Sequence, residues 1–125
     1  MIYLDTHVAA WLYATGPAAL SIPAAELIAA SDDVRVSPMV RLELQHLYEI
    51  GRVAEPAAAV IDALTAALGL TVCTASFPRV VHEAEKMAWT RDPFDRLIVA
   101  QAAIHAAPLV TKDATLHASY PGAVW

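Results

Sequence analysis

The chain is poor in the features that mark several protein classes. Its 125 residues include one cysteine and four glycines, and only 17% of them are charged. A single cysteine cannot form an internal disulfide, which excludes a small secreted scaffold held by cross-links. The first five residues, MIYLD, carry no basic group and no cleavable apolar core, so we expect no signal peptide.

Long hydrophobic runs are also missing. The most apolar stretch, 97–110, is interrupted by Gln101, His105 and Pro108, and it is too short and too polar to cross a bilayer. We therefore expect no membrane partner. Apolar residues nevertheless make up 58% of the chain, which excludes a disordered chain. The length suffices to bury a core, and we interpret residues 1–125 as one domain.

Short apolar segments alternate with helical patterns along the chain. The strands are predicted at 2–4, 34–36, 70–73 and 109–111, with an extended tail at 123–125; the helices are predicted at 7–13, 23–30, 38–50, 56–68, 78–87, from 93 to shortly before Pro108, and at 114–118. Thr6 is the predicted N-cap of the first helix, and Ser37 followed by Pro38 is a strong start for the third. This alternation predicts an α/β fold with a parallel sheet covered on both faces.

Two acidic residues follow predicted strands. Asp5 comes directly after 2–4, and Asp113 lies two residues after 109–111. Both therefore fall at the carboxyl edge of the sheet, where ligands bind in folds of this class. Each also has a simpler interpretation, because Asp5 with Thr6, or Asp113 before 114–118, can serve as a helix cap.

Two further acids lie on helices. Glu43 shares a face with Met39 and Leu47, and Asp95 shares one with Ile98 and Val99, so both are predicted to point inward. The alternatives are an ion pair of Glu43 with Arg41 or Arg96, and a capping box formed by Asp92 and Asp95.

Together these four acids predict a metal site. Carboxylates placed close together repel one another unless a cation neutralises them. Oxygen ligands without clustered histidines or cysteines suit Mg²⁺ or Mn²⁺ better than Zn²⁺. Such a site polarises a phosphate and activates a water molecule for attack.

Four ordered segments resemble the motifs of PIN-domain ribonucleases, and most closely the VapC-type toxins of type II toxin–antitoxin systems: 4–7 (LDTH), 40–44 (VRLEL), 91–100 (RDPFDRLIVA) and 109–113 (LVTKD). The resemblance implies a PIN-like three-layer α/β fold, with a short central parallel sheet flanked by helices. It also implies a cytoplasmic Mg²⁺- or Mn²⁺-dependent endoribonuclease that leaves a 5′-phosphate and a 3′-hydroxyl. The implied partners are RNA, a cognate antitoxin and a second copy of the chain.

Carried over residue by residue, the resemblance assigns the catalytic and metal-binding acids to Asp5, Glu43, Asp95 and Asp113. Asp5 and Asp95 would bind the metal directly, and the other two would complete the site. The hydroxyl that the family has near the site corresponds to Thr6 or to Thr111, and Asp92 is a cap that can also support the site. The implied RNA-backbone contacts are Arg91, Arg96 and Lys112, unless these residues are solvated or pair with the acids.

Two other functions compete with this interpretation. A phosphohydrolase would use Asp5 as a nucleophile, but position 7 is His7 rather than the second acid which that chemistry favours. A non-catalytic binding module would tolerate loss of an acid, yet all four are present. The positions of Trp11 and Tyr13, in the core or in an exposed patch for a partner, stay open.

The predicted metal site changes how the net charge of the chain is interpreted. Eight basic residues face thirteen acidic ones, for a formal net charge of −5, which argues against a broad basic surface for nucleic acid. Without the four site acids, nine acids remain against eight basic residues. We therefore expect modest RNA affinity that depends strongly on the metal.

Overall fold

The computed structural model describes residues 1–125 and has the predicted alternation of strands and helices. The strands are β1 (Ile2–Leu4), β2 (Val34–Val36), β3 (Thr71–Val72), β4 (Leu109–Val110) and β5 (Ala123–Val124). The helices are α1 (Thr6–Ala14), α2 (Ile22–Ala30), α3 (Pro38–Glu49), α4 (Ala57–Leu68), α5 (Phe77–Ala84), α6 (Pro93–Ala103) and α7 (Ala114–Ser119). A short 3-10 helix over Pro17–Ala19 was not predicted.

The five strands form one parallel sheet in the order β3-β2-β1-β4-β5. On β1, Ile2 is in register with Val34 of β2, and Leu4 is in register with Val110 of β4. The chain thus builds the sheet to one side of β1 first and to the other side later. The order of the strands therefore reverses at β1. α/β proteins bind ligands in the crevice that forms at the carboxyl ends of the strands on the two sides of such a reversal. In this chain that crevice follows Leu4 and Val110.

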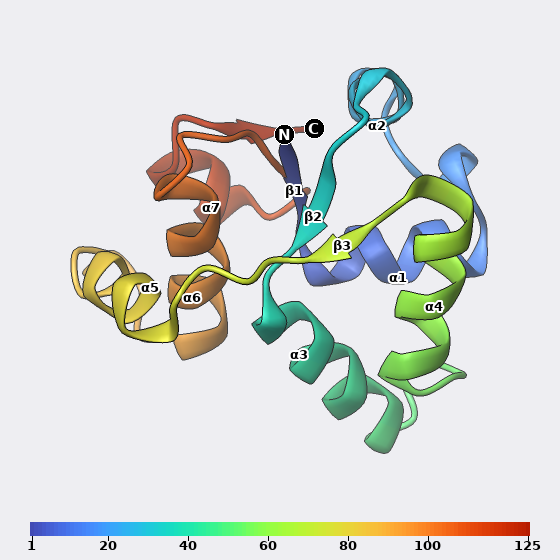
Figure 1. Cartoon of the computed structure of the whole chain (residues 1–125), viewed down its shortest axis with the longest axis horizontal. Helices are drawn as coiled ribbons and strands as arrows, with labels where there is room; N and C mark the ends of the chain where they lie inside the picture. The colour runs from blue at the N-terminus through green and yellow to red at the C-terminus, as the bar shows by residue number, and fades with distance from the viewer.

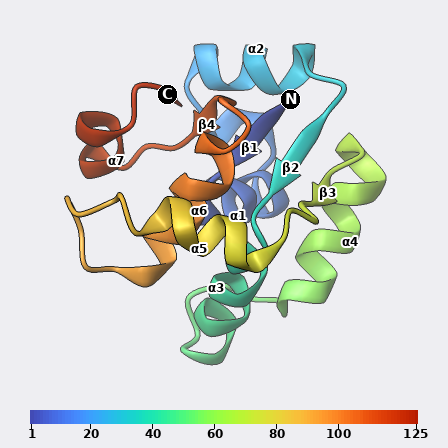
Figure 2. The same ribbon diagram turned by 60° about the vertical axis from the view of Figure 1, so that its left-hand side comes forward.

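Helices cover the sheet on both sides (Figure 1), which confirms the predicted fold class. Helices α1 and α4 lie on one side and α5 and α6 on the other, while α2 and α3 lie at opposite ends of the strands in both views (Figure 2). The buried apolar side chains form one cluster of 29 residues that includes β1 and β4 in full. Burial on both faces explains why these strands are apolar throughout. None of the helices has the length and apolar character needed to span a membrane.

One helix start differs from the prediction. The N-cap of α1 is Asp5, not Thr6: Asp5 is extended (φ −72°, ψ 160°) and its carboxylate accepts a hydrogen bond from the backbone amide of Thr6. Thr6 lies in the first turn of the helix and is fully buried. Asp5, the first residue after β1, already has the extended backbone of an N-cap. It therefore caps the helix one position before Thr6, the predicted cap. The predicted cap of α3 is confirmed, since Ser37 Oγ accepts a hydrogen bond from the amide of Met39.

Candidate functional site

A pocket of about 470 Å³ opens at the carboxyl ends of β1 and β4. Five of its eight lining residues are acids, namely Asp5, Glu43, Asp92, Asp95 and Asp113, and the others are His7, Trp11 and Lys112. The fold therefore brings together the four acids selected from the sequence, and it adds Asp92. We refer to this cavity as the carboxylate pocket.

Three of these acids are helix N-caps. Asp5 Oδ1 accepts from the amide of Thr6 at 2.8 Å, Asp92 Oδ1 from the amide of Phe94 at 2.9 Å, and Asp113 Oδ1 from the amide of Thr115 at 2.7 Å. The capping interpretation is correct at all three positions. It does not compete with a role in the pocket, because the cap fixes each carboxylate where its helix begins at the pocket wall.

Thr111 connects the two acids that follow β1 and β4. Its hydroxyl donates to Asp5 Oδ2 at 2.7 Å and accepts from the backbone amide of Asp113 at 3.1 Å. Thr6 Oγ1 is equally buried and has no partner that meets hydrogen-bond geometry, although its hydroxyl acts on Glu43 and opposes the rise in the pKa of that carboxyl. Of the two threonines that the sequence left open, Thr111 is the one with a hydrogen bond to an acid of the pocket.

The carboxylates of the pocket have no cationic partner. Neither Arg41 nor Arg96 lies within 4.0 Å of Glu43, so the predicted ion-pair alternative is wrong. Burial raises the pKa of Glu43 and that of Asp5 above their usual range. Burial and then the neighbouring charges of Asp92 and Asp5 raise the pKa of Asp95 to about 7. The pocket thus holds five acids and one lysine, Lys112, which forms an ion pair with none of them.

The three candidate RNA contacts do not lie together. Lys112 lines the pocket, whereas Arg91 and Arg96 do not. Arg91 Nη1 donates to the carbonyl of Ala88 at 2.8 Å, and Arg96 Nε donates to the carbonyl of Thr90 at 2.8 Å. In this structure both arginines hold the segment that leads into α6.

Two lining residues were not selected from the sequence. His7 and Trp11 stand four residues apart on α1, and their rings are 5.9 Å apart between centroids. The signal was present, because residues four apart share a helix face and this helix begins at Asp5. Both residues also line a larger, mostly apolar groove of about 920 Å³ that extends toward Leu47 and residues 52–55. This cavity is called the apolar groove below.

The donor chemistry of the carboxylate pocket fits a hydrated divalent cation. Its acids supply the hard oxygen ligands that Mg²⁺ and Mn²⁺ prefer. No three acidic, histidine or cysteine side chains are close enough to hold a metal ion by themselves. Mg²⁺ rarely uses such a protein cage, because it retains several water molecules and binds through one or two carboxylates. A wide pocket with several unpaired carboxylates matches that requirement.

A comparison with known sequences gives a family and a relative. The model of the PIN domain matches residues 2–120. Ribonuclease VapC22 of Mycobacterium tuberculosis (strain ATCC 25618 / H37Rv) is 33% identical over 132 residues, which cover 99% of this chain and 98% of that protein.

Solved structures share the fold across the whole chain. A chain of a toxin–antitoxin complex from Klebsiella pneumoniae has a TM-score of 0.68 at 17% identity and covers 100% of this chain and 97% of that chain. VapBC2 from Rickettsia felis, bound to a DNA fragment from its promoter, gives 0.65 at 21% identity with coverages of 99% and 96%. VapBC-1 from nontypeable Haemophilus influenzae gives 0.66 at 20% identity with coverages of 100% and 96%.

Proposed function

Since the chain belongs to the PIN-domain family, we propose that it is the toxin of a type II toxin–antitoxin pair and a Mg²⁺- or Mn²⁺-dependent endoribonuclease. The observation that carries the proposal is the carboxylate pocket. It gathers the acids of all four family-like segments at the point where the sheet reverses its direction of growth. The name of its relative, a ribonuclease, supports RNA as the substrate.

Four acids of the pocket have a role in holding the metal in this proposal. Asp5 and Asp95 would bind the metal directly, and Glu43 and Asp113 would complete the site, either directly or through water. A bound Mg²⁺ or Mn²⁺ would supply Lewis-acid chemistry that polarises the phosphate and lowers the pKa of water. Thr111 holds the carboxylate of Asp5 in place through its hydrogen bond.

The position of Lys112 suits a contact to the RNA backbone. It is exposed at the pocket and lies within 4.0 Å of none of the acids. Its ammonium group is therefore free to bind a phosphate oxygen next to the metal. Arg91 and Arg96 have no such role in the proposal, because their guanidinium groups bind backbone carbonyls.

The proposed partners are an antitoxin and a second copy of the chain. The solved structures that share the fold include toxin–antitoxin complexes, which supports an antitoxin here. Exposed apolar side chains, among them Ile22, Leu42 and Ile50, offer surface for such partners. We propose that residues 1–125 act as one domain in the cytoplasm.

The competing functions receive no support from the pocket. In a phosphohydrolase, Asp5 would attack phosphorus with a carboxylate oxygen. Here Oδ1 accepts from the amide of Thr6 and Oδ2 from the hydroxyl of Thr111, an arrangement that orients a ligand rather than freeing a nucleophile. A binding module would have no need for five neighbouring acids that form no ion pair, which are costly to hold together.

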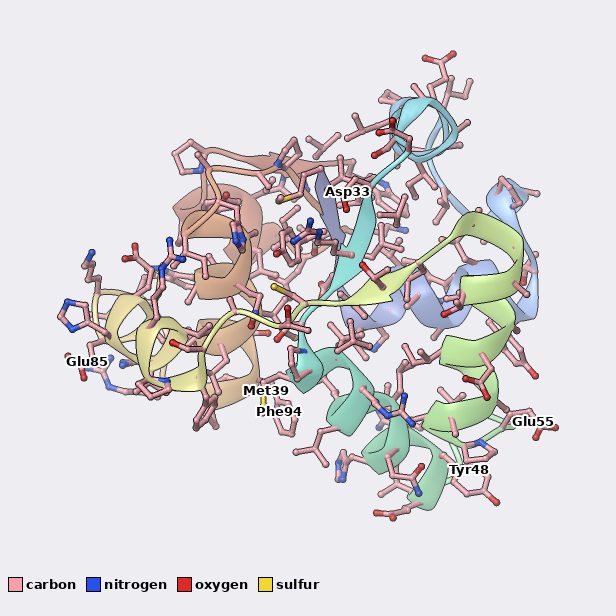
Figure 3. All side chains as sticks on the ribbon, in the orientation of Figure 1. Asp33, Met39, Tyr48, Glu55, Glu85 and Phe94 are labelled. Atoms are coloured by element: carbon pink, nitrogen blue, oxygen red, sulfur yellow. The ribbon has the colours of Figure 1, made fainter.

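Cleavage of total cellular RNA tests the proposal. We expect the purified chain to cut RNA with Mg²⁺ or Mn²⁺, to leave 5′-phosphate and 3′-hydroxyl ends, and to be inactive in EDTA. Asp95→Asn is expected to lower the rate more than about 100-fold, beyond the effect typical of residues that merely support a ligand. Glu85→Gln is the matched control, because Glu85 directly follows α5, at the left of Figure 3, and does not line the pocket.

Two results would contradict the proposal in different ways. If Asp95→Asn cuts RNA at the wild-type rate, the site is wrongly assigned. If the wild-type chain cuts no RNA with either metal and binds no Mn²⁺ at millimolar concentration, the chain is a binding module instead of a nuclease.

A further inference from the structure

Trp11 has an unusual position for a large aromatic residue. It is the only apolar side chain that lines the carboxylate pocket, and it also lines the apolar groove. It is partly exposed and does not belong to the core cluster or to the side chains packed against it. Burial of an indole contributes strongly to folding. An indole that remains at the wall between two cavities is available for another contact.

Lys112 lies over aromatic rings instead of pairing with an acid. Its Nζ is 6.0 Å from the ring centroid of Trp11 and 5.8 Å from that of Trp125. These distances are within the range of cation–π attraction. The pocket offers five carboxylates, yet none is within 4.0 Å of this ammonium group. The two indoles thus hold the one lysine of the pocket at its rim.

Trp125 holds the ring of Trp11 in place. It follows β5, packs against the core, and meets Trp11 edge-on, with ring centroids 5.8 Å apart and an interplanar angle of 64°. Edge-to-face contacts of this kind favour one relative orientation of two rings. Trp11 is therefore held by a neighbour that is itself anchored.

We propose that Trp11 stacks on an unpaired base of the RNA substrate next to the scissile phosphate, and that Lys112, positioned by Trp11 and Trp125, binds the adjoining backbone phosphate. The inference rests on the proposed function and adds a stacking residue to it. An aromatic face beside a cation is the combination by which proteins hold single-stranded nucleic acid. Trp11 supplies the face, Lys112 supplies the charge, and both line the pocket that contains the acids.

A protein partner in the apolar groove would explain Trp11 less well. Such a partner would use the side of Trp11 that faces Leu47 and Val53. It would not account for the free ammonium group of Lys112 at the acidic side. A phosphodiester next to a base uses both features at once.

Steady-state cleavage of a short single-stranded RNA that contains a mapped cut site tests the inference. We expect Trp11→Ala and Trp11→Leu to raise KM about tenfold or more, which corresponds to the loss of one base stack, and to change kcat by less than about threefold. Trp11→Phe keeps a ring and should restore most of the affinity. Lys112→Met should lower the slope of log affinity against log salt by about 0.7.

An abasic substitution separates stacking from a merely structural effect. Removing the base that stacks on Trp11 should raise the KM of the wild-type chain as much as Trp11→Ala does, and should have no further effect in Trp11→Ala. Phe77→Ala is the control, because this aromatic residue is 63% exposed on α5 and lines neither cavity described above. Melting temperatures of all variants show whether the fold is kept.

The results separate the inference from the function on which it rests. If the wild-type chain cuts the RNA and Trp11→Leu has the KM of Phe77→Ala, the stacking role is overturned and the nuclease stands. The stacking role is also overturned if an abasic substitution raises KM as much in Trp11→Ala as in the wild-type chain, whichever base is removed. If the wild-type chain cuts no RNA, both are overturned.

Discussion

Tyr3 in β1 and Asp5 directly after it are both buried, but their surroundings differ. The hydroxyl of Tyr3 donates to Cys73 Sγ at 3.1 Å and lies 2.9 Å from His105 Nδ1, and the rings of Tyr3 and His105 stack at 5.9 Å between centroids. Burial raises the pKa of Tyr3 above its usual range, so the phenol stays neutral. Hydrogen bonds satisfy the polar groups of this cluster, and the guanidinium of Arg35 lies close enough to Tyr3 to act on its hydroxyl.

The carboxylate pocket, to which Asp5 belongs, differs from the Tyr3 cluster because its charged groups are not paired. Its acids crowd together without a cationic partner, and the pKa of Asp95 is raised to about 7. Satisfied polar groups add stability to a core, whereas crowded charges reduce it until a ligand binds. The comparison teaches that the Tyr3 cluster serves the fold and that the pocket serves a ligand.

Loss of the Thr111 hydroxyl should slow RNA cleavage, although less than Asp95→Asn does, because it acts on the pocket through the orientation of Asp5. Thr111→Val removes the hydrogen bond that orients Asp5, so we expect the rate of RNA cleavage to fall about 10- to 100-fold. The matched control is Thr71→Val on β3, an exposed threonine, which should keep the wild-type rate. An unchanged rate in Thr111→Val would show that the bond does not position Asp5 for the reaction.

A substitution in the Tyr3 cluster is expected to lower stability and to leave activity unchanged. Tyr3→Phe removes the hydroxyl that contacts Cys73 and His105 in the core, and we expect the free energy of unfolding to fall by about 1 to 2 kcal/mol. RNA cleavage at a temperature where the variant is folded should not change. Urea denaturation measures the difference against Tyr48→Phe, an exposed tyrosine. A loss of activity without a loss of stability would break the division between the two regions.

Asp95→Asn should stabilise the chain in the absence of metal, although it abolishes the proposed activity. The pKa of Asp95 is about 7 in the folded chain and 3.8 in the reference state. The folded state therefore loses stability as pH rises from about 4 to about 7, and the full penalty is present above that range. We expect a gain of about 1 kcal/mol in Asp95→Asn at pH 8, after solvent screening of a half-exposed group, and almost none at pH 4.

Thermal unfolding in EDTA at the two pH values measures this difference. The control is Glu26→Gln on α2, an exposed acid, which should show little difference at either pH. Equal stability of Asp95→Asn and the wild-type chain at pH 8 would mean that the pocket is not a source of strain.

Mn²⁺ should stabilise the chain by an amount similar to that of Asp95→Asn. At ten times its dissociation constant it should stabilise the wild-type chain by about 1.4 kcal/mol, which corresponds to a rise in melting temperature of roughly 5 °C. Asp95→Asn should show less than half of that rise, and Tyr3→Phe should show all of it. An equal rise in Asp95→Asn would place the metal outside the carboxylate pocket.

Much of the fold and of the pocket could be predicted because local chemistry specifies both. Ser37 before Pro38 starts α3 as predicted, and the apolar strands are buried on both faces. Asp5 and Asp113 were selected because they follow strands, where the backbone itself sets their position. Glu43 and Asp95 were selected because each shares a helix face with apolar residues. The cap of α1 was misplaced by one residue, because both Asp5 and Thr6 are good caps and only the strand end decides between them.

Helix periodicity and the ends of strands are properties of neighbouring residues, so the sequence by itself determined the elements, the parallel sheet and the four acids. The tertiary structure decided which residues distant in the chain meet. Thr111 reaches Asp5 across 106 positions because β4 lies beside β1. Lys112 reaches Trp11 and Trp125 for the same reason, while Arg91 and Arg96 stay outside the pocket. Strand order sets these contacts, and no local pattern specifies it.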